Sequence, residues 1–436
     1  MRSNEKFEVS QETLLNILKI RLKNGVRTLK NRKLHRIIFC TYFLFALLVW
    51  SESSSNFGNN GVIYIAPLTI ALVKLTLPLM LIGGSVALLI LFGTPLGTRR
   101  ITNELRRVGL TNKAGETPIL LSKLKDEKQE KVTILEFAAV GIPMCEWEDK
   151  KANIESGLNV HIVKLKEGKN KRTILLYTVS ADNQLLPKIQ WNDKYLIDDS
   201  STLVLGESHL GLVTVDLSKI PHILLGGSTG SGKSVLLKLL LMQMVKKNAV
   251  VNIADFKGGV DFPKIWHEKC RICFDEDTLV DILTELVEEL EARKFIFRKC
   301  GCPNIDEYNQ QTGANLQRYV FACDEVAEVL DKVGLTKEQK EKVSLIESKL
   351  SIIARQGRAF GIHLILATQR PDANILSGQI RNNIDCRVCG RADMVLSQII
   401  LDDTSAADLI PKDAAGRFLL HDGTMFQAYI FDENNF

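Results

Sequence analysis

Residues 222–234 read His-Ile-Leu-Leu-Gly-Gly-Ser-Thr-Gly-Ser-Gly-Lys-Ser, and this stretch decides the fold of the chain around it. Gly227 to Ser234 fit the pattern G-x-x-x-x-G-K-[ST], in which a glycine-rich backbone binds phosphate. The apolar run 223–225 predicts a strand before the loop, and the apolar spacing of 235–245 predicts a helix after it. A strand, a glycine-rich turn and a helix in this order indicate a nucleotide site.

Each residue type in this loop suits a nucleoside triphosphate. Glycine adopts backbone angles that other residues avoid, which lets N–H groups point toward phosphate oxygens, and the following helix adds its dipole. Lys233 is expected to reach the terminal phosphates and the Ser234 hydroxyl to hold Mg²⁺. With ATP and Mg²⁺ as predicted cofactors, the nucleotide-binding residues are Gly227, Ser228, Thr229, Gly230, Ser231, Gly232, Lys233 and Ser234.

Two acidic residues, Asp324 and Glu325, end the apolar run 319–323. At the carboxyl end of a strand beside the phosphate loop, Asp324 is expected to contribute to the Mg²⁺ shell. Glu325 is then placed to orient and polarise the attacking water. The alternative, a strand running into a solvated acidic turn, is weakened by the phosphate loop in the same chain.

A second polar strand tip follows the apolar run 363–368. Its amide, Gln369, suits a sensor of the γ-phosphate, with a capped loop as the alternative. Asp255 and Lys257 end the strand that follows the loop helix, and their predicted role is structural or in coupling, without chemistry of their own.

Strands and helices alternate from about residue 216 onward, which indicates an α/β core with a parallel sheet over 216–436. The pattern predicts strands at 221–225, 249–254, 318–323, 362–368 and 385–389, and helices at 233–246, 277–300 and 340–359. Residues 100–215 are mixed and predict a small α+β adaptor domain. Its expected strands are 132–140, 158–165, 173–179 and 202–205, with a helix at 146–157.

Charge is unevenly distributed along the 436 residues, whose net charge is +5. Residues 1–36 carry ten Lys/Arg against three Glu, so the rest of the chain is slightly acidic, and a surface that binds DNA there must be a local patch. The basic N-terminal segment 1–33 contains an amphipathic stretch from residue 11. That stretch suits an anionic membrane surface, with a solvated helix or a disordered basic tail as open alternatives.

Residues 34–93 predict a membrane anchor of two transmembrane helices. The apolar segments are 37–50 and 75–92, and the longer one would make roughly 27 Å of helix, close to the bilayer core of about 30 Å. The polar residues 51–60 would form the loop between them. Basic residues flank both segments, so the expected protein is multi-pass in the cell membrane, with both termini and the core cytoplasmic.

The sequence contains nine cysteines, and a nucleotide-binding core that meets ATP in the cytosol keeps its thiols reduced. Two C-x-x-C pairs, Cys270/Cys273 and Cys386/Cys389, raise the question of a zinc site. Both pairs lie in strand-like runs, where residues three apart point to opposite faces. Core packing is therefore the favoured interpretation, and metal binding stays open.

Several segments resemble the FtsK/SpoIIIE family of DNA translocases. They are Thr202–Gly206, Val215–His222 leading into the phosphate loop, Gly361–Pro371, Ile400–Asp402 and Ala415–Leu419. The resemblance covers about residues 200–436. It implies a RecA-like, ATP-hydrolysing motor domain that works as a homo-oligomer, a hexameric ring, and threads DNA through its centre.

The resemblance also implies three functional arginines. Arg358 matches the family's arginine just before the sensor strand, a candidate arginine finger that would join Glu325 and Gln369 in the catalytic set. Arg370 and Arg381 match basic positions on the DNA-binding loops of the family's pore. Solvation at the protein surface is the alternative for all three.

The domain organisation indicates which members of the family this chain resembles. Cell-division translocases carry more membrane spans, a long linker and a winged-helix module, none of which this sequence shows. Two short spans, an adaptor and a bare motor are similar to the FtsK-type coupling proteins of Gram-positive integrative conjugative elements, which connect a relaxase–DNA complex to a type IV secretion channel. Open alternatives are chromosome or plasmid DNA segregation, type VII protein secretion, and a membrane-bound binding module with an inactive nucleotide site.

Overall fold

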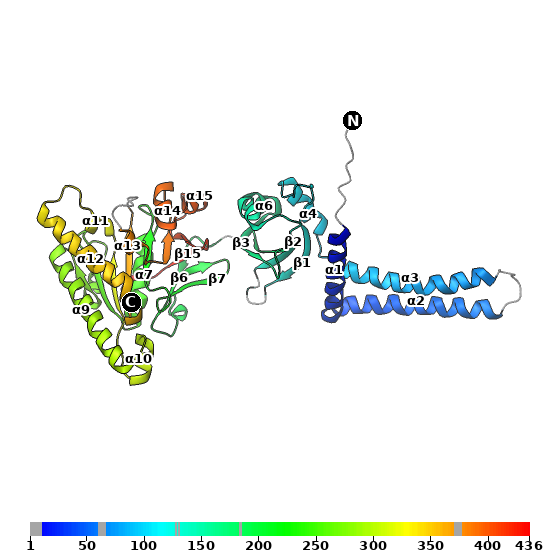
Figure 1. Cartoon of the computed structure of the whole chain (residues 1–436), viewed down its shortest axis with the longest axis horizontal. Helices are drawn as coiled ribbons and strands as arrows, with labels where there is room; N and C mark the ends of the chain where they lie inside the picture. Colours follow the sequence, from blue (N-terminus) through cyan, green and yellow to red (C-terminus); the bar gives the residue numbers. More distant parts are fainter. Residues whose placement is uncertain (1–10, 60–66, 127–128, 130, 183–184, 370–376) are drawn as a thin grey trace, which may run out of the picture. The chain divides into compact units, whose positions relative to one another are not determined.

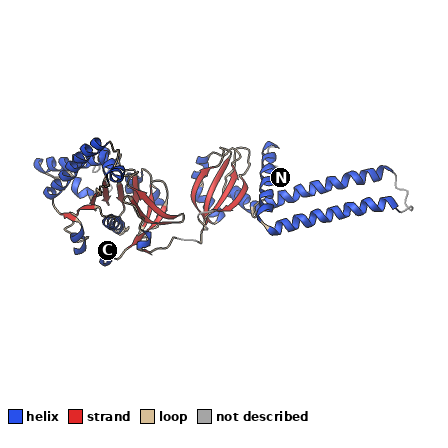
Figure 2. Ribbon diagram, turned by 90° about the horizontal axis from the view of Figure 1, so that it is seen from below, coloured by secondary structure: helices blue, strands red, loops and turns tan. Residues whose placement is uncertain are grey.

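The computed structural model of the chain describes residues 11–59, 67–126, 129, 131–182, 185–369 and 377–436. The chain divides into two compact units, Met1–Asn183 and Gln184–Phe436. Helices and strands of each unit are distinguished in Figure 2, where both units contain a sheet.

The first unit begins with three long helices, α1 (Gln11–Asn31), α2 (Lys33–Asn59) and α3 (Pro67–Gly93). Helices α2 and α3 lie side by side, and α1 crosses the base of this pair (Figure 1). Two glycines let the crossing backbones touch. A Cβ added to Gly25 would lie 2.0 Å from the Leu89 carbonyl oxygen, and one on Gly93 would lie 1.8 Å from that of Arg21.

The two predicted membrane spans map onto α2 and α3, with one difference: residues 51–59 are helical rather than a loop, because α2 continues to Asn59. Within the residues open to description, no helix taken alone has both the length and the apolar character needed to cross a bilayer. Leu81–Gly93 and Thr98–Arg107, bent by 56°, meet the requirement as a pair.

A small α+β fold follows in the first unit. Its four-stranded antiparallel sheet has the order β1-β2-β4-β3. Phe137 and Trp147, with ring centroids 5.4 Å apart, lie fully buried in its core. The elements are α4 (Thr98–Arg107), β1 (Ile119–Lys125), β2 (Thr133–Ala138), α5 (Met144–Asp149), α6 (Lys151–Leu158), β3 (Val160–Glu167) and β4 (Thr173–Ser180). Strands β2, β3 and β4 agree with three of the predicted strands.

The second unit is built on an 11-stranded sheet, counted over the described residues, with the order β10-β9-β11-β12-β8-β13-β14-β15-β6-β7 and β5 paired to β15. Strands β10 to β13 in this order are parallel, and the following pairs are antiparallel. The strands are β5 (Ile189–Gln190), β6 (Thr202–Ser208), β7 (Gly211–Asp216), β8 (Ile223–Gly226), β9 (Val250–Ala254), β10 (Arg271–Cys273), β11 (Tyr319–Cys323), β12 (Ile362–Thr368), β13 (Cys386–Cys389), β14 (Arg417–Leu420) and β15 (Met425–Ile430).

Two predictions need correction here. The sheet is mixed rather than purely parallel, because β14, β15, β6 and β7 extend it by antiparallel pairing. The same pairing moves the domain boundary, since β6 hydrogen-bonds to β15 and therefore belongs to the second unit, not to an adaptor that ends at residue 215.

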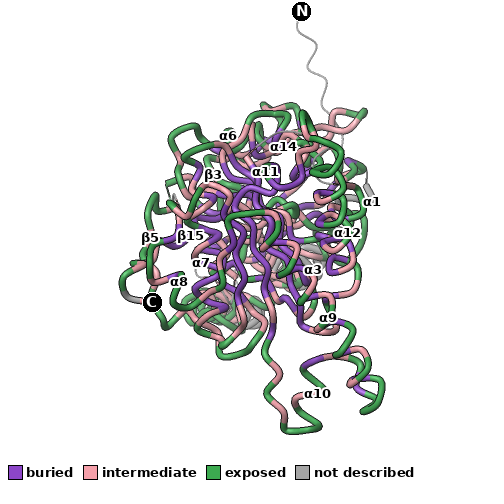
Figure 3. The backbone as a smooth tube through the Cα atoms, turned by 90° about the vertical axis from the view of Figure 1, so that its left-hand side faces the viewer, coloured by how far each residue is buried: buried purple, intermediate pink, exposed green. Residues whose placement is uncertain are grey.

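Helices cover both faces of this sheet, as expected for parallel strands that are apolar on both sides. Within β8, Leu224 packs with α9 and α12, whereas Ile223 and Leu225 pack with α7 on the opposite face. The central strands are consequently buried (Figure 3). The helices are η1 (Asp193–Tyr195), α7 (Lys233–Lys246), α8 (Lys264–Lys269), α9 (Glu276–Cys300), α10 (Ile305–Thr312), α11 (Val326–Leu330), α12 (Lys337–Phe360), α13 (Gly378–Arg381), α14 (Met394–Leu401), α15 (Ser405–Leu409) and η2 (Glu433–Asn435).

Candidate functional site

The phosphate loop lies at the carboxyl end of β8, between β12 and β13, and runs directly into α7. Gly230 and Gly232 have φ of +77° and +95°, which side chains disfavour. A Cβ on Gly227 would lie 2.4 Å from the Ser231 Oγ, so the loop leaves no room for a side chain at this position. The Ser231 hydroxyl is buried without a hydrogen-bond partner among the described residues. A tight glycine-rich loop fits a phosphate group, which could also accept a hydrogen bond from the buried Ser231 hydroxyl.

Two distant segments brace this loop. The backbone N–H of Ser228 donates to the Arg391 carbonyl over 2.8 Å, and the Arg391 guanidinium donates to the Thr229 carbonyl over 2.6 Å. The N–H of Gly416 donates to the Ser231 carbonyl over 2.8 Å. Sequence reasoning missed Arg391, since nothing in a lone arginine after β13 indicates that it holds the phosphate loop.

Asp324 lies where the sequence predicts it, at the end of β11, and gathers three partners. The Lys233 Nζ lies 3.2 Å from its Oδ1 and also donates to its backbone carbonyl. The Ser234 hydroxyl donates to the same Oδ1 over 3.0 Å, and the Lys257 Nζ donates to Oδ2 over 2.6 Å. The side chain of Asp324 is 2% exposed. The carboxylate therefore has both oxygens engaged by groups from two other strand ends.

These contacts keep Asp324 ionised. Burial would raise the pKa of the carboxyl group, but the charge of Lys233 and the contacts with Lys257 and Ser234 outweigh burial, so the pKa lies below its ordinary value. A serine hydroxyl beside an ionised carboxylate is a set of oxygen donors that Mg²⁺ prefers. The residues present thus fit the predicted magnesium ion.

Glu325 is joined to the end of β12. Its Oε1 accepts from the Thr368 hydroxyl and its Oε2 from the backbone N–H of Gln369, both over 2.8 Å. The side-chain oxygen of Gln369 in turn accepts from the Thr229 hydroxyl over 2.8 Å. The structure therefore brings the predicted base, the predicted sensor and the phosphate loop into one hydrogen-bonded chain. Thr368 was not predicted, although its place at the strand tip could have indicated it.

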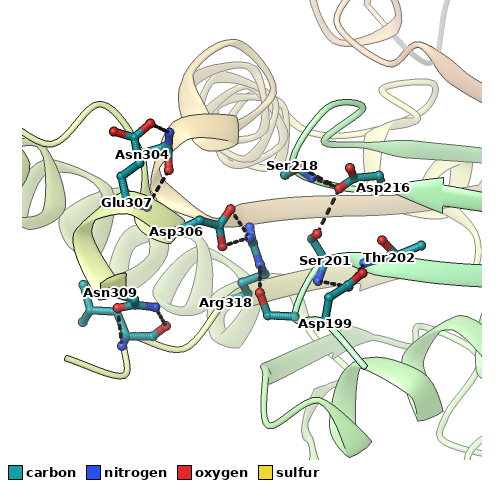
Figure 4. Close-up of polar contacts among 12 residues, drawn as sticks. Asp199, Ser201, Thr202, Asp216, Ser218, Asn304, Asp306, Glu307, Asn309 and Arg318 are labelled. Carbon is teal, nitrogen blue, oxygen red and sulfur yellow. Dashed lines mark hydrogen bonds and ion pairs between the residues drawn. The ribbon is translucent and has the colours of Figure 1, made fainter. Parts of the chain in front are cut away.

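Arg358 lies far from this chain of contacts. It lies in the last turn of α12, just before β12 begins, whereas the phosphate loop lies at the carboxyl ends of β8 and β12. Its side chain is exposed, and its Nε donates to the Ser218 carbonyl over 2.9 Å. Ser218 is itself held by Asp216, which also accepts from Ser201 (Figure 4). Arg358 does not join the nucleotide site of its own subunit.

Of the two predicted DNA-binding arginines, Arg370 lies outside the described residues and Arg381 lies within them. Arg381 ends α13, and its guanidinium lies 3.3 Å from Asp402, which is closer to Arg387, at 2.5 Å. Arg381 thus contacts an acidic neighbour, and its predicted role in DNA binding stays a prediction.

The two cysteine pairs are too far apart to share a metal ion. Cys273 lies on β10 at one edge of the sheet, and Cys386 and Cys389 lie on β13. Four strands separate β10 from β13, or roughly 24 Å at about 4.8 Å per strand. Burial raises the pKa of the Cys386 and Cys389 thiols to about 12, so both stay protonated and pack as apolar groups.

Known proteins resemble the second unit most. The sequence profile of the FtsK/SpoIIIE family matches residues 190–373. The DNA translocase FtsK of Helicobacter pylori is 29% identical over 279 residues, 58% of this chain and 31% of its own length. The DNA translocase FtsK of Chlorobaculum tepidum is 34% identical over 48% of this chain and 27% of its own. The chain therefore spans less than a third of these curated relatives.

A solved structure extends the likeness beyond the core. The pCW3 conjugation coupling protein TcpA, in a monomer form with ATPγS, is 35% identical, with a TM-score of 0.58. The match covers 77% of this chain and 96% of the TcpA chain. With the profile match over residues 190–373 and relatives named FtsK, identity at this level over nearly a whole chain shows that the chain belongs to the FtsK/SpoIIIE family.

Proposed function

We propose that this protein is an ATP-driven DNA translocase. The observation that carries the proposal is the chain of contacts from the phosphate loop through Gln369 to Glu325. It links the group that would activate water to the group that would detect the γ-phosphate. Curated relatives named DNA translocases support DNA as the substrate.

The residues divide the work of hydrolysis as follows. The loop N–H groups and Lys233 bind the phosphates. To reach them, the Lys233 Nζ must move away from the Asp324 Oδ1 that it contacts in the nucleotide-free chain. Ser234 and Asp324 would hold Mg²⁺, which supplies charge neutralisation at the phosphates. Glu325, fixed by Thr368 and Gln369, orients the attacking water and accepts its proton. A γ-phosphate near Gln369 would change the hydrogen bond between the Gln369 side chain and Thr229. This change would transmit the nucleotide state to β12, which ends directly before Gln369.

The second part of the proposal is a ring, in which Arg358 acts on the nucleotide of the neighbouring subunit. Its exposure and its distance from the nucleotide site of its own subunit support this role, since an arginine finger must leave its own subunit. Within the described residues the guanidinium contacts a carbonyl, not an acid, so no ion pair holds it back. A hexamer is the proposed form.

The third part of the proposal is the biological setting, coupling of DNA to a conjugative type IV secretion channel through a relaxase. The similarity to the TcpA coupling protein supports it over chromosome segregation. Type VII protein secretion remains the competing function. DNA-stimulated ATPase activity of the full chain separates them, because stimulation by DNA is expected and stimulation by a secreted protein substrate alone would favour the competitor.

The fourth part of the proposal is membrane anchoring through α2 and α3. Large apolar side chains on these helices are exposed, and contiguous apolar surface of this kind marks a membrane or protein interface. The most exposed of these side chains are Leu34, Ile37, Leu44, Phe45, Leu48, Leu79, Ile82 and Leu91. On α1, exposed Lys19, Lys23, Arg27 and Lys30 accompany exposed Leu15, Leu18 and Val26, a composition that suits an anionic lipid surface.

Membrane extraction tests the anchor. The full chain should stay with membranes washed at alkaline pH and should be released by detergent. Release by the alkaline wash alone would contradict the anchor and leave the motor proposal untouched.

A further inference from the structure

Lys257 is a second lysine at the predicted magnesium site, and it has no role in the proposed hydrolysis of ATP. It follows β9, and its Nζ donates to the Asp324 Oδ2 over 2.6 Å. Lys233 and Ser234 occupy the other oxygen of that carboxylate. Two ammonium groups therefore share one buried carboxylate in the nucleotide-free chain.

This arrangement conflicts with the binding of a divalent cation. An ion held by Asp324 and Ser234 would lie within a few ångströms of the Lys257 ammonium group, and like charges at this distance repel strongly beside a carboxylate that is only 2% exposed. Lys257 and the ion therefore compete for Asp324. Either the lysine moves away or the ion binds weakly.

Two other carboxylates are ready to receive the lysine. Asp255 is 1% exposed, its Oδ1 accepts from the backbone N–H of Lys257 over 3.0 Å, and its Oδ2 has no hydrogen-bond donor within the described part of the chain. A buried carboxylate oxygen without a partner is costly, which makes it a strong acceptor for a nearby ammonium group. Asp261 Oδ2 already lies 3.6 Å from the Lys257 Nζ.

The backbone beside Lys257 suits such a movement. Gly258 and Gly259 follow with φ of +81° and +80°, and the next residue, Val260, is 85% exposed. The Lys257 side chain is 30% exposed, whereas that of Lys233 is 3% exposed. Of the two lysines, Lys257 is therefore the less enclosed and the better able to leave Asp324.

We propose that Lys257 is a positioning residue that takes the place of Mg²⁺ on Asp324 in the nucleotide-free protein and passes to Asp255 and Asp261 when the ion and nucleotide bind. The lysine keeps the site closed to free cations, so that magnesium enters together with nucleotide. The inference rests on the proposed function, because it assumes that Asp324 holds the ion.

Mn²⁺ binding to the full-length, nucleotide-free protein tests the inference. Mn²⁺ prefers the same oxygen ligands as Mg²⁺, and electron paramagnetic resonance measures the free ion. The Lys257→Met variant should bind Mn²⁺ at least about tenfold more tightly than the wild type, because the competing charge is gone. Lys257→Arg, which keeps the charge, should retain the weak affinity of the wild type.

The matched control is Lys264→Met, since the Lys264 side chain is 91% exposed on α8 and its removal should leave Mn²⁺ affinity unchanged. Adding Asp324→Asn to Lys257→Met should abolish the gain, which places the ion at Asp324. If Lys257→Met does not fold, Lys257→Gln provides the same test. A lysine that serves the fold alone would lower the melting temperature without tightening Mn²⁺ binding.

Unchanged or weaker Mn²⁺ binding by Lys257→Met, or tighter binding by Lys257→Arg as well, overturns the inference. ATPase assays on the wild type keep this failure distinct from failure of the proposed function. DNA-stimulated hydrolysis with unchanged Mn²⁺ affinity in the variant would sink the role of Lys257 alone. Tighter Mn²⁺ binding without any DNA-stimulated hydrolysis would contradict the proposed function instead.

Discussion

The backbone N–H of Gln369 donates to the Oε2 of Glu325 over 2.8 Å, which ties the tip of β12 to the tip of β11. The Thr368 hydroxyl adds a second bond to the other carboxylate oxygen. Glu325 is therefore oriented by the same strand end whose glutamine side chain contacts the phosphate loop. Loss of this orientation should affect hydrolysis more than nucleotide binding.

Thr368→Val tests that orientation. The change keeps the side-chain shape and removes the donor to Glu325, and one hydrogen bond to a charged group contributes about 1.5–3 kcal/mol. We expect kcat for ATP to fall about tenfold or more, with little change in KM. Thr214→Val, on the exposed face of β7, is the matched control and should leave both constants unchanged. An increase in KM with unchanged kcat would show that Thr368 acts in binding.

Arg358→Ala should stop hydrolysis, because the finger stabilises charge that develops on the neighbour's nucleotide. Arginine fingers contribute factors of about 10³–10⁵. Arg355→Ala removes an exposed arginine from the same helix and should retain most of the activity. Rings mixed from Arg358→Ala and Glu325→Gln subunits should recover activity, since some sites then contain both wild-type residues.

Complete inactivity of such mixed rings, with each variant folded, assembled and able to bind ATP, would contradict the action of Arg358 on a neighbour. A loss of stability in Arg358→Ala would point instead to its contact with Ser218 as a structural bond.

Two buried histidines predict a pH dependence of stability. His222 is fully buried, its Nε2 contacts the Ala354 carbonyl over 3.1 Å, and its Nδ1 accepts from the backbone N–H of Leu364 over 2.9 Å. This pattern requires a neutral ring. Burial lowers the pKa of His222 from 6.5 to about 4, with the bond to Ala354 opposing the shift, and burial lowers the pKa of His363 well below 6.5.

As the pH falls, the two histidine rings therefore become protonated in the unfolded chain before they do so in the folded protein. Stability is fully present above the unfolded pKa of about 6.5 and is lost as the pH falls toward the folded pKa. For His222, the free energy of unfolding falls by roughly 2 kcal/mol between pH 6.5 and 5, at 1.36 kcal/mol per pH unit. His363 changes stability in the same direction. Hydrogen-exchange mass spectrometry on β12 peptides should show the loss of stability, and His222→Asn should make the pH slope shallower, leaving the part that His363 contributes. The exposed His267 on α8 provides the control, because His267→Asn should leave the pH slope unchanged.

The sequence predicts the centre of the second unit well and its periphery poorly. The helix expected at 233–246 agrees with α7, Lys233–Lys246, because the glycine loop defines its start and its apolar spacing continues to its end. The antiparallel strands β14, β15 and β7 were not predicted. The pairs β14–β15 and β6–β7 are local hairpins, but the pairing of β15 with β6, which joins these hairpins into one sheet, connects segments far apart in the chain.

At the nucleotide site, too, some features follow from the sequence and others are found only in the structure. The positions of Asp324 and Glu325 follow from an apolar strand that ends in acids, which sequence patterning detects. The contacts of Lys257 and Arg391 depend on which strand ends become neighbours in the sheet, and a single sequence does not contain that information. Roles for Gln369, Arg358 and the two pore arginines stay predictions.

The most direct test of the account is ATP-driven displacement of a DNA triplex by the full-length protein. A translocase that moves along DNA strips a third strand from its path, and the account predicts displacement with Mg²⁺ and ATP. It predicts none with ATPγS or with Glu325→Gln, while Glu328→Gln, which makes the same chemical change at an exposed glutamate of α11, displaces the strand normally. Displacement by Glu325→Gln at the wild-type rate, or none by a wild-type protein that hydrolyses ATP on DNA, would contradict it.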